Sequence, residues 1–205
     1  MTRKNKLREL YGNIDIYLFD QLLKGTFDLC QRVLDIGVGG GRNLPYFLQN
    51  GYAVYGVDTN ATAIENVKAL SMLLAPANDT DNFVVAPAEE LPFDPEHFDL
   101  IICSAVLHFA KNHQHFEAIL KSAWRVLKPG GYFFARLASD IGIEKLVTAQ
   151  GDGLYLLADG STRYLVNYEI LNRYVDLLGA ELFEPIKTTN VQDLRCMTTW
   201  CLIKT

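Results

Sequence analysis

The sequence predicts an α/β fold, a doubly wound and mostly parallel sheet with helices on both faces. The main indication is the stretch 33–43, a short apolar strand followed by closely spaced glycines and then by apolar residues at helical spacing. A second apolar strand, 53–57, ends at Asp58. A third run, 98–103, is apolar apart from Asp99, which is typical of a central parallel strand buried on both faces.

The glycine-rich turn after the first strand suits a bound nucleoside. Only backbone without side chains turns so tightly and lets a ligand lie against the main chain and the following helix. Asp58 stands where such units carry the acid that binds ribose. The dinucleotide pattern G-x-G-x-x-G would begin at Gly37 and Gly39, but Arg42 stands where it needs a third small residue. This departure disfavours a nicotinamide cofactor.

The remaining elements follow from apolar periodicity and from residues that start or end helices and strands. Asp159-Gly160, between two apolar runs, is a typical hairpin turn. In chain order, the sequence predicts a helix over 13–24 closed by Gly25, a helix over 60–74 capped by Thr59 or Asn60, a strand over 83–86, a helix over 113–127, a break at 129–131 before a strand over 132–137, a hairpin over 154–166, a helix over 167–178 capped by Asn167 and ended by Gly179, and two last strands over 180–188 and 197–203.

Several of these segments together resemble class I S-adenosylmethionine-dependent methyltransferases. The resemblance covers roughly residues 30–137 and rests on 35–41 with the spacing D-x-G-x-G-x-G, on Asp58, and on the segments 88–93, 98–104 and 127–132. It implies a Rossmann-like methyltransferase fold with a seven-stranded sheet, an antiparallel last strand and S-adenosylmethionine as cofactor. We expect one domain over residues 1–205, with an N-terminal helical cap over 1–30 and a hairpin insertion over 150–166.

The resemblance also implies which residues contact the cofactor. The expected contacts are Asp35 and the backbone of Gly37, Gly39 and Gly41 for the methionine part, Asp58 and the adjoining Thr59 for the ribose, Ala88 and Glu89 for the adenine edge, and Ser104 at the end of the fourth strand. Two of the acids also have a structural alternative. Asp35 could stabilise the turn, and Asp58 could cap the following helix while it binds ribose.

The residues that would meet the methyl acceptor are less sharply indicated. His108, just beyond the fourth strand, is the best-placed candidate general base, with packing beneath a loop as the alternative. Arg136 could bind an anionic acceptor with its planar guanidinium, or form a structural ion pair. In the resembled family an N-terminal helix often covers the pocket, so Tyr11 and Tyr17 are candidate substrate residues, with packing at the sheet edge as the alternative.

Charge and composition restrict the partner. The formal net charge of −5 disfavours nucleic acid, and favours a small-molecule acceptor. A basic cluster, formed by Arg3, Lys4, Lys6 and Arg8, is expected to be a solvated tail. The alternatives left open are an RNA or protein methyltransferase, and a cofactor-binding module without transferase activity.

The compartment follows from cysteine usage and from the apolar runs. Four cysteines without C-x-x-C spacing predict reduced thiols. No apolar run has the length of a membrane span, and the first residues lack the apolar core of a signal peptide, so we expect a cytoplasmic protein without membrane contact. His113 and His115 are expected to be solvated, and no metal is expected, because residues two apart on a helix face different directions.

Overall fold

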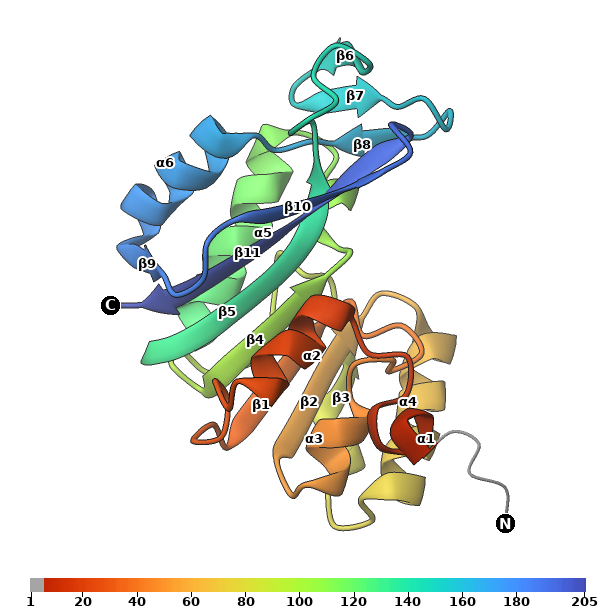
Figure 1. Cartoon of the computed structure of the whole chain (residues 1–205). Coiled ribbons are helices and arrows are strands. Elements are labelled where there is room, and N and C mark those ends of the chain that lie inside the picture. The colour runs from red at the N-terminus through yellow and green to blue at the C-terminus, as the bar shows by residue number, and fades with distance from the viewer. Residues whose placement is uncertain (1–5) are drawn as a thin grey trace.

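The computed structural model describes residues 6–205, which form a central sheet with helices on both faces and a small second sheet at its edge (Figure 1). The strands are β1 (Arg32–Ile36), β2 (Ala53–Asp58), β3 (Phe83–Val85), β4 (Phe98–Ser104), β5 (Leu127–Ser139), β6 (Thr148–Gly151), β7 (Leu154–Leu156), β8 (Thr162–Tyr164), β9 (Ala180–Leu182), β10 (Lys187–Val191) and β11 (Arg195–Lys204). The helices are α1 (Lys6–Tyr11), α2 (Ile16–Leu23), α3 (Pro45–Gln49), α4 (Ala61–Leu74), α5 (His113–Val126) and α6 (Tyr168–Leu178), with 3-10 turns η1 (Thr80–Asn82) and η2 (Leu107–Phe109).

The central sheet reverses its strand order beside β1. Its order is β10-β11-β5-β4-β1-β2-β3, and β9 also pairs with β11. Strands β1 to β5 run parallel, and β11 is antiparallel to β5. In such sheets ligands bind beyond the carboxyl ends of the strands where the order reverses, here between β1 and β4. The predicted doubly wound fold with an antiparallel last strand is confirmed.

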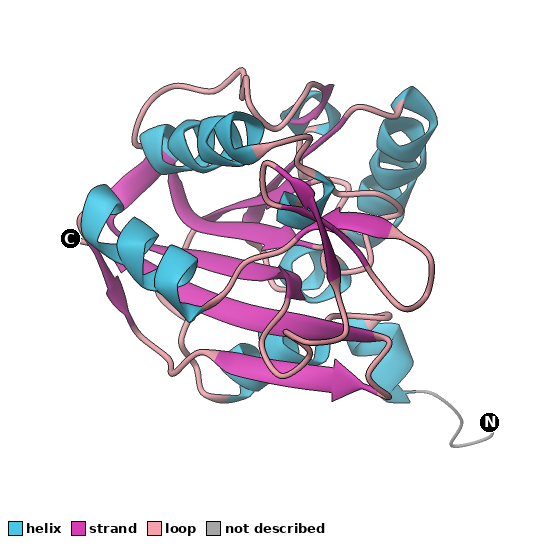
Figure 2. Cartoon of the chain, turned by 90° about the horizontal axis from the view of Figure 1, so that it is seen from above, coloured by secondary structure: helices cyan, strands magenta, loops and turns pink. Residues whose placement is uncertain are grey.

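Alternating side chains of the central strands build two cores. In β4, Ile101 and Cys103 pack with α5 and α6, whereas Leu100 and Ile102 pack with α2, α3 and α4 on the other face. Figure 2 shows helices on both sides of the sheet. The apolar run of β4 is therefore buried from both directions, which fixes the position of its carboxyl end.

Side-chain caps set the helix boundaries close to the predicted ones. Asn60, one of the two predicted caps, accepts from the amide of Thr62 at 2.9 Å. Asn167 caps α6, which Gly179 ends in the left-handed conformation. Asp15 caps α2 by accepting from the amide of Tyr17 at 3.0 Å, so this helix begins at Ile16.

The predicted break before the fifth strand is wrong, because residues 129–131 lie inside β5. Leu127 already pairs with Phe98, and the register then shifts between Phe98 and Leu100. Gly130 has φ of +75°, so the Pro-Gly-Gly segment forms an irregularity in the strand. A proline and a glycine near the start of a strand therefore do not end it here.

The C-terminal edge also differs from the prediction of two strands. The segment 180–188 is divided into β9 and β10, which pair with different parts of β11, Leu182 with Leu202 and Lys187 with Thr199. Pro185 lies between them and has no amide proton for a sheet ladder. The central sheet thus has eight strands instead of seven.

The hairpin over 154–166 is confirmed as β7 and β8, and β6 adds a third strand to it. Figure 1 shows this small sheet beyond the carboxyl end of β5. Every residue of β6 is exposed, so its sequence has no apolar pattern that would predict a strand. At the turn, Asp159 accepts from the amide and the hydroxyl of Ser161 at 2.9 and 2.6 Å.

Other predictions concern the chain as a whole. Arg3 and Lys4 of the basic cluster lie outside the described residues. The four cysteines are free thiols and all are buried. Between residues 6 and 205, none of the helices has both the length and the apolar character needed to cross a membrane.

Candidate functional site

A cavity of about 530 Å³ lies where the strand order reverses, and we call it the switch-point cavity. The loops after β1, β2, β3 and β4, together with α5, form its wall. Its lining residues are Gly37, Val57, Asp58, Thr59, Ala86, Pro87, Ala88, Glu89, Ala105, Val106, Phe109, Lys111, His115 and Ile119. Of the predicted cofactor residues, it therefore brings together Gly37, Asp58, Thr59, Ala88 and Glu89.

Gly37 opens the turn after β1 and gives the cavity its floor. Its φ is +66°, and a Cβ at this position would collide with Cγ2 of Val106. Glycine is therefore required twice, once by the backbone conformation and once by the close approach of the loop after β4. The result is a cradle of bare backbone at the carboxyl edge of the sheet.

Asp58 holds this turn from the end of β2. One carboxylate oxygen accepts from the Gly39 amide at 2.9 Å, and the other accepts from the Asn60 amide at 2.9 Å. The carboxylate thus joins the glycine turn to the start of α4 and still lines the cavity. The predicted cap of α4 is Asn60 itself, so Asp58 supports the helix through its cap.

Asp35 lies beneath the turn, 2% exposed, and is not among the residues that line the cavity. Burial raises the pKa of Asp35 to about 7, and this effect outweighs the opposing influence of Arg42 and the hydrogen bond from Asn43. At neutral pH the Asp35 carboxyl is therefore protonated to a greater extent than that of an exposed aspartate. Its position outside the lining of the cavity favours the structural alternative over a direct contact to a ligand.

The raised pKa of Asp35 predicts a pH-dependent stability. An acid whose pKa is higher in the folded state binds more protons when folded, so its contribution is favourable at low pH and is lost as pH rises through about 7. The Asp35→Asn variant does not ionise at this position, so it escapes this loss. We expect the free energy of unfolding of the variant, minus that of the unmodified protein, to be at least about 1 kcal/mol larger at pH 8 than at pH 5. Urea unfolding of both proteins at the two pH values measures this. An equal effect at both pH values would contradict it.

The far wall of the switch-point cavity carries a pair of polar side chains. His115 Nε2 lies 3.2 Å from Glu89 Oε1, and His115 Nδ1 accepts from the Lys111 amide at 3.1 Å. His113 lies apart from this pair, within 2.6 Å of the Tyr164 hydroxyl and 3.2 Å of the Tyr174 hydroxyl. The expectation that both histidines are solvated is wrong, because each faces a partner within the fold.

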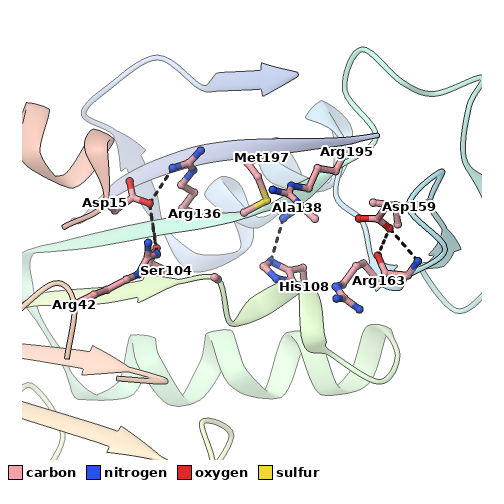
Figure 3. Close-up of a pocket in the computed structure, with 13 residues that line it drawn as sticks. Asp15, Arg42, Ser104, His108, Arg136, Ala138, Asp159, Arg163, Arg195 and Met197 are labelled. Carbon is pink, nitrogen blue, oxygen red and sulfur yellow. Dashed lines mark hydrogen bonds and ion pairs between the residues drawn. The ribbon is translucent and has the colours of Figure 1, made fainter. Parts of the chain in front are cut away.

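A second cavity, of about 310 Å³, adjoins the first, and we call it the arginine cavity. Figure 3 shows it between β5, β11, the end of β4 and the hairpin of β7 and β8. It is lined by Asp15, Arg42, Ser104, Ala105, His108, Arg136, Ala138, Leu157, Asp159, Ser161, Arg163, Arg195 and Met197. The predicted residues Ser104, His108 and Arg136 are therefore brought together here.

One end of the arginine cavity is a closed ionic cluster around Asp15, which is 2% exposed (Figure 3). Its Oδ2 accepts from Arg136 Nη1 at 3.0 Å and from the Ser104 hydroxyl at 3.4 Å, and lies 3.7 Å from Arg42 Nη2. Arg42 also donates to the Ser104 hydroxyl at 2.8 Å. Arg136 thus forms the structural ion pair given as its alternative, and Ser104 belongs to the cluster instead of the switch-point cavity.

His108 lies near the middle of the arginine cavity, 7% exposed. Its Nδ1 accepts from the Ala138 amide at 3.3 Å, so its Nε2 carries the proton of the neutral ring. Burial, and to a smaller extent Arg163, lower the pKa of His108 to about 4. At neutral pH this histidine is a hydrogen-bond donor at Nε2, and it is a weak base.

The other end of the arginine cavity holds two arginines without a carboxylate within ion-pair distance. Across the described residues, Arg195 makes no side-chain hydrogen bond, and Arg163 donates to its neighbouring backbone carbonyl at 2.7 Å. Arg163 also lies over the ring of Phe109 at 4.9 Å, and Phe109 lines the switch-point cavity. The hairpin therefore lines the arginine cavity and contacts one residue that lines the switch-point cavity.

The two tyrosines predicted for the substrate lie away from both cavities. Tyr11 stacks on Tyr46 at 5.6 Å, beside α3. Tyr17 donates to or accepts from the Thr189 hydroxyl at 2.7 Å, and Arg136 lies over its ring at 5.1 Å. Tyr17 therefore contacts the ionic cluster through Arg136 and does not line the arginine cavity.

Sequence reasoning missed Asp15, Arg163, Arg195 and Asp159 as cavity residues, and interpreted Arg42 only as a departure from a dinucleotide pattern. These residues come from segments far apart in the chain, so no local spacing connects them. A usable signal was the concentration of arginines near strand ends and turns. Arg42, Arg136, Arg163 and Arg195 each stand at such a position.

The two cavities meet at Ala105, which lines both of them. Ala105 has φ of +64°, an uncommon conformation for a residue with a Cβ, and its amide donates to the Arg136 carbonyl at 2.8 Å. Residues in such conformations concentrate at functional sites, where the surrounding structure holds them. A ligand in one cavity could reach a ligand in the other past this residue.

Comparison with protein families gives a match to the family described as "Methyltransferase domain" over residues 34–135. The matched segment contains most of β1, all of β2 to β4, α3 to α5 and most of β5. It therefore includes the whole glycine turn and every residue that lines the switch-point cavity, and it leaves out the hairpin and β11.

Individual relatives of this chain are also methyltransferases by name. The chain is 37% identical to an uncharacterized methyltransferase of Synechocystis over 50% of this chain and 45% of that protein. It is 36% identical to a ubiquinone/menaquinone biosynthesis C-methyltransferase of Pseudomonas savastanoi over 49% of this chain and 39% of that protein. The match thus spans less than half the length of these relatives.

A similar fold occurs in a 1,6-didemethyltoxoflavin-N1-methyltransferase of Burkholderia thailandensis, whose crystal structure holds 1,6-didemethyltoxoflavin and S-adenosylhomocysteine. The TM-score is 0.65 at 19% identity, over 90% of this chain and 76% of that chain. Because it covers 90% of this chain, this similarity extends beyond residue 135.

Proposed function

Because the chain belongs to the class I S-adenosylmethionine-dependent methyltransferases, we propose that it transfers a methyl group from S-adenosylmethionine to a small molecule. The observation that carries the proposal is the pair of adjoining cavities at the carboxyl edge of the sheet, which meet at Ala105. The switch-point cavity would hold the cofactor, and the arginine cavity would hold the acceptor.

The switch-point cavity fits a nucleoside with an extended side chain. Its volume lies within the usual range of ligand pockets, about 300–1,000 Å³. A Cβ at Gly37 would fill the cradle, and Asp58 presents a carboxylate at its edge. We propose that the backbone of Gly37, Gly39 and Gly41 holds the methionine part, with the buried Asp35 at the end of β1, and that Asp58 and Thr59 bind the ribose.

The adenine would lie along Ala88 and Glu89, opposite Phe109 and Ile119. When bound, S-adenosylmethionine supplies an electron-poor methyl carbon on a sulfonium, with a neutral thioether as leaving group. The chain's residues then need to align the acceptor for an in-line displacement and to exclude water. The small arginine cavity, about 310 Å³, restricts the acceptor to a small molecule or to a narrow extension of a larger one.

The geometry revises the role proposed for His108. A general base works best when its pKa lies near the working pH, whereas the pKa of His108 is lowered to about 4 by burial and Arg163. Its Nδ1 is occupied by the Ala138 amide, so Nε2–H is the group it offers to the cavity. We propose that His108 positions the acceptor by donating a hydrogen bond from Nε2.

Calorimetric titration with S-adenosylmethionine, S-adenosylhomocysteine and NADH tests the cofactor proposal. Binding of the two sulfur nucleosides without NADH is the expected result. Binding without turnover over a broad acceptor panel would favour a cofactor-binding module. Binding of RNA that falls steeply with added salt would favour a nucleic-acid substrate instead.

Asp58→Ala is expected to weaken S-adenosylmethionine binding by more than about tenfold, because the variant loses the proposed ribose contact and the bond to the Gly39 amide. Asp79→Ala is the matched control. Asp79 likewise accepts from a backbone amide, that of Asp81 at 2.9 Å, but does not line the cavity. Calorimetry on folded protein measures both, and an unchanged affinity in Asp58→Ala would exclude the ribose assignment.

A further inference from the structure

We propose that the methyl acceptor is a small organic carboxylate, held in the arginine cavity by Arg163 and Arg195 and methylated on a carboxylate oxygen. This inference rests on the proposed methyltransferase function and adds to it the class of acceptor and the atom that receives the methyl group. It follows from the charge of the cavity and from the groups there that could accept a proton.

The side chains that line the arginine cavity carry an excess of positive charge. Four arginines and two aspartates line the arginine cavity, although the whole chain has a formal net charge of −5. Arg136 and Arg42 are matched to the buried Asp15. Arg163 and Arg195 remain without an ion-pair partner among the described residues, near Asp159, so this part of the cavity would attract an anion.

Asp159 does not cancel this excess. Its carboxylate accepts from the amide and the hydroxyl of Ser161 at 2.9 and 2.6 Å. Hydrogen bonds from Ser161, and then Arg195 and Arg163, lower the pKa of Asp159. One carboxylate therefore faces two guanidiniums, and a planar guanidinium binds a carboxylate through two parallel hydrogen bonds.

Few side chains of the arginine cavity could accept a proton from an acceptor molecule. Of the described residues that line the cavity, Asp15, Asp159 and His108 are those that could accept a proton. Asp15 is paired with Arg136, Asp159 is held ionised, and His108 carries its proton on Nε2. None of them is a base suited to neutral pH, so the acceptor must arrive with no proton to lose. Together with the positive charge of the cavity, this favours an anion.

A carboxylate satisfies both requirements. One of its oxygens attacks the methyl carbon, a new C–O bond forms, and the C–S bond breaks with its electron pair moving to sulfur. An anion and a sulfonium thereby become a neutral methyl ester and a neutral thioether, and no proton is transferred. The ester has lost the charge that Arg163 and Arg195 hold, which weakens its binding and favours release.

Benzoate and benzamide provide the binding test, because they share shape and differ in charge. We expect benzoate to bind at least about tenfold more tightly than benzamide, and Arg163→Gln with Arg195→Gln to reduce benzoate affinity at least about tenfold. Arg173→Gln, on the exposed side of α6 and outside both cavities, is the control and should leave it unchanged. NMR titration followed on the backbone amide signals of residues that line the arginine cavity measures each affinity.

S-adenosylhomocysteine affinity, measured on the same variants, separates this inference from the proposed function. Its loss in the unmodified protein would overturn the cofactor site, whereas unchanged values across the arginine variants show intact protein. Equal binding of benzoate and benzamide, or benzoate binding that survives the double substitution, would overturn the anion site. The absence of benzoate binding would do the same.

Transfer of a labelled methyl group to a panel of carboxylic acids, each paired with its amide, tests the atom methylated. Methyl esters release labelled methanol in alkali, so alkali-labile product from the acids alone is the expected result. Alkali-stable product would overturn methylation on oxygen of a carboxylate. Benzoate binding without ester from any acid would also overturn the methylation step.

Discussion

Gly37→Ala is expected to have a large effect, a loss of about 2–4 kcal/mol in the free energy of unfolding together with loss of cofactor binding. The added Cβ would be held at φ of +66° and would collide with Cγ2 of Val106. Both Gly37 and Val106 line the switch-point cavity, so any relief of the collision moves the cavity wall. Chemical denaturation and calorimetry with S-adenosylhomocysteine measure the two effects.

Gly40→Ala is the matched control, three residues along the same turn. A Cβ at Gly40 has no atom within 4 Å and its φ is not in the left-handed region. This variant should change stability by less than about 1 kcal/mol and keep its cofactor affinity. If Gly40→Ala proved as damaging as Gly37→Ala, the collision with Val106 would not be the cause.

Val106→Ala in the Gly37→Ala background separates the two causes of the loss. The second substitution removes the colliding methyl group, and leaves the cost of a positive φ at an alanine. We therefore expect partial recovery of stability. Recovery of cofactor affinity without full recovery of stability would show that the shape of the cavity wall is what the glycine protects.

The elements that the sequence predicted well are those specified by neighbouring residues. The glycine turn, the cap at Asn60 and the end of α6 at Gly179 each depend on the conformation of a few adjacent residues. The switch-point cavity inherits this property, because its walls follow directly from the ends of β1 to β4. This explains why Asp58, Thr59, Ala88 and Glu89, which spacing and resemblance predict as cofactor contacts, all line this cavity.

The elements that the sequence did not predict depend on contacts distant in the chain. β6 consists of polar and small residues and exists because β7 pairs with it. The division of β9 from β10 depends on how each pairs with β11. His108 was found as a cavity residue, but its role was not, because the tautomer is set by the amide of Ala138 on another strand.

The acceptor side illustrates the same limit at a single residue. Asp15 falls inside the predicted helix over 13–24, and only the folded chain brings it to Arg136 from β5, Arg42 from the glycine turn and Ser104 from β4. Its carboxylate also caps α2. The buried carboxylate of Asp15 therefore connects the start of α2 to the glycine turn, to β4 and to β5.

Asp15→Asn is expected to reduce the free energy of unfolding by about 3 kcal/mol, because it keeps the shape of the side chain but leaves the partly buried Arg136 without a negative partner. Asp20→Asn is the control, since the Asp20 side chain is 40% exposed and pairs with Lys24 on the surface. Exposed pairs of this kind contribute up to about 1 kcal/mol. Urea unfolding measures both, and equal losses would contradict a special role for burial.

The same substitution should act in the opposite direction on ligand binding. Without the Asp15 charge, Arg42 and Arg136 add to the positive potential of the arginine cavity, so benzoate affinity should rise while stability falls. A variant that merely loosens the fold would lower both quantities together. Opposite changes in stability and anion affinity would therefore show that Asp15 neutralises part of the cavity and that the remaining charge on Arg163 and Arg195 selects the ligand.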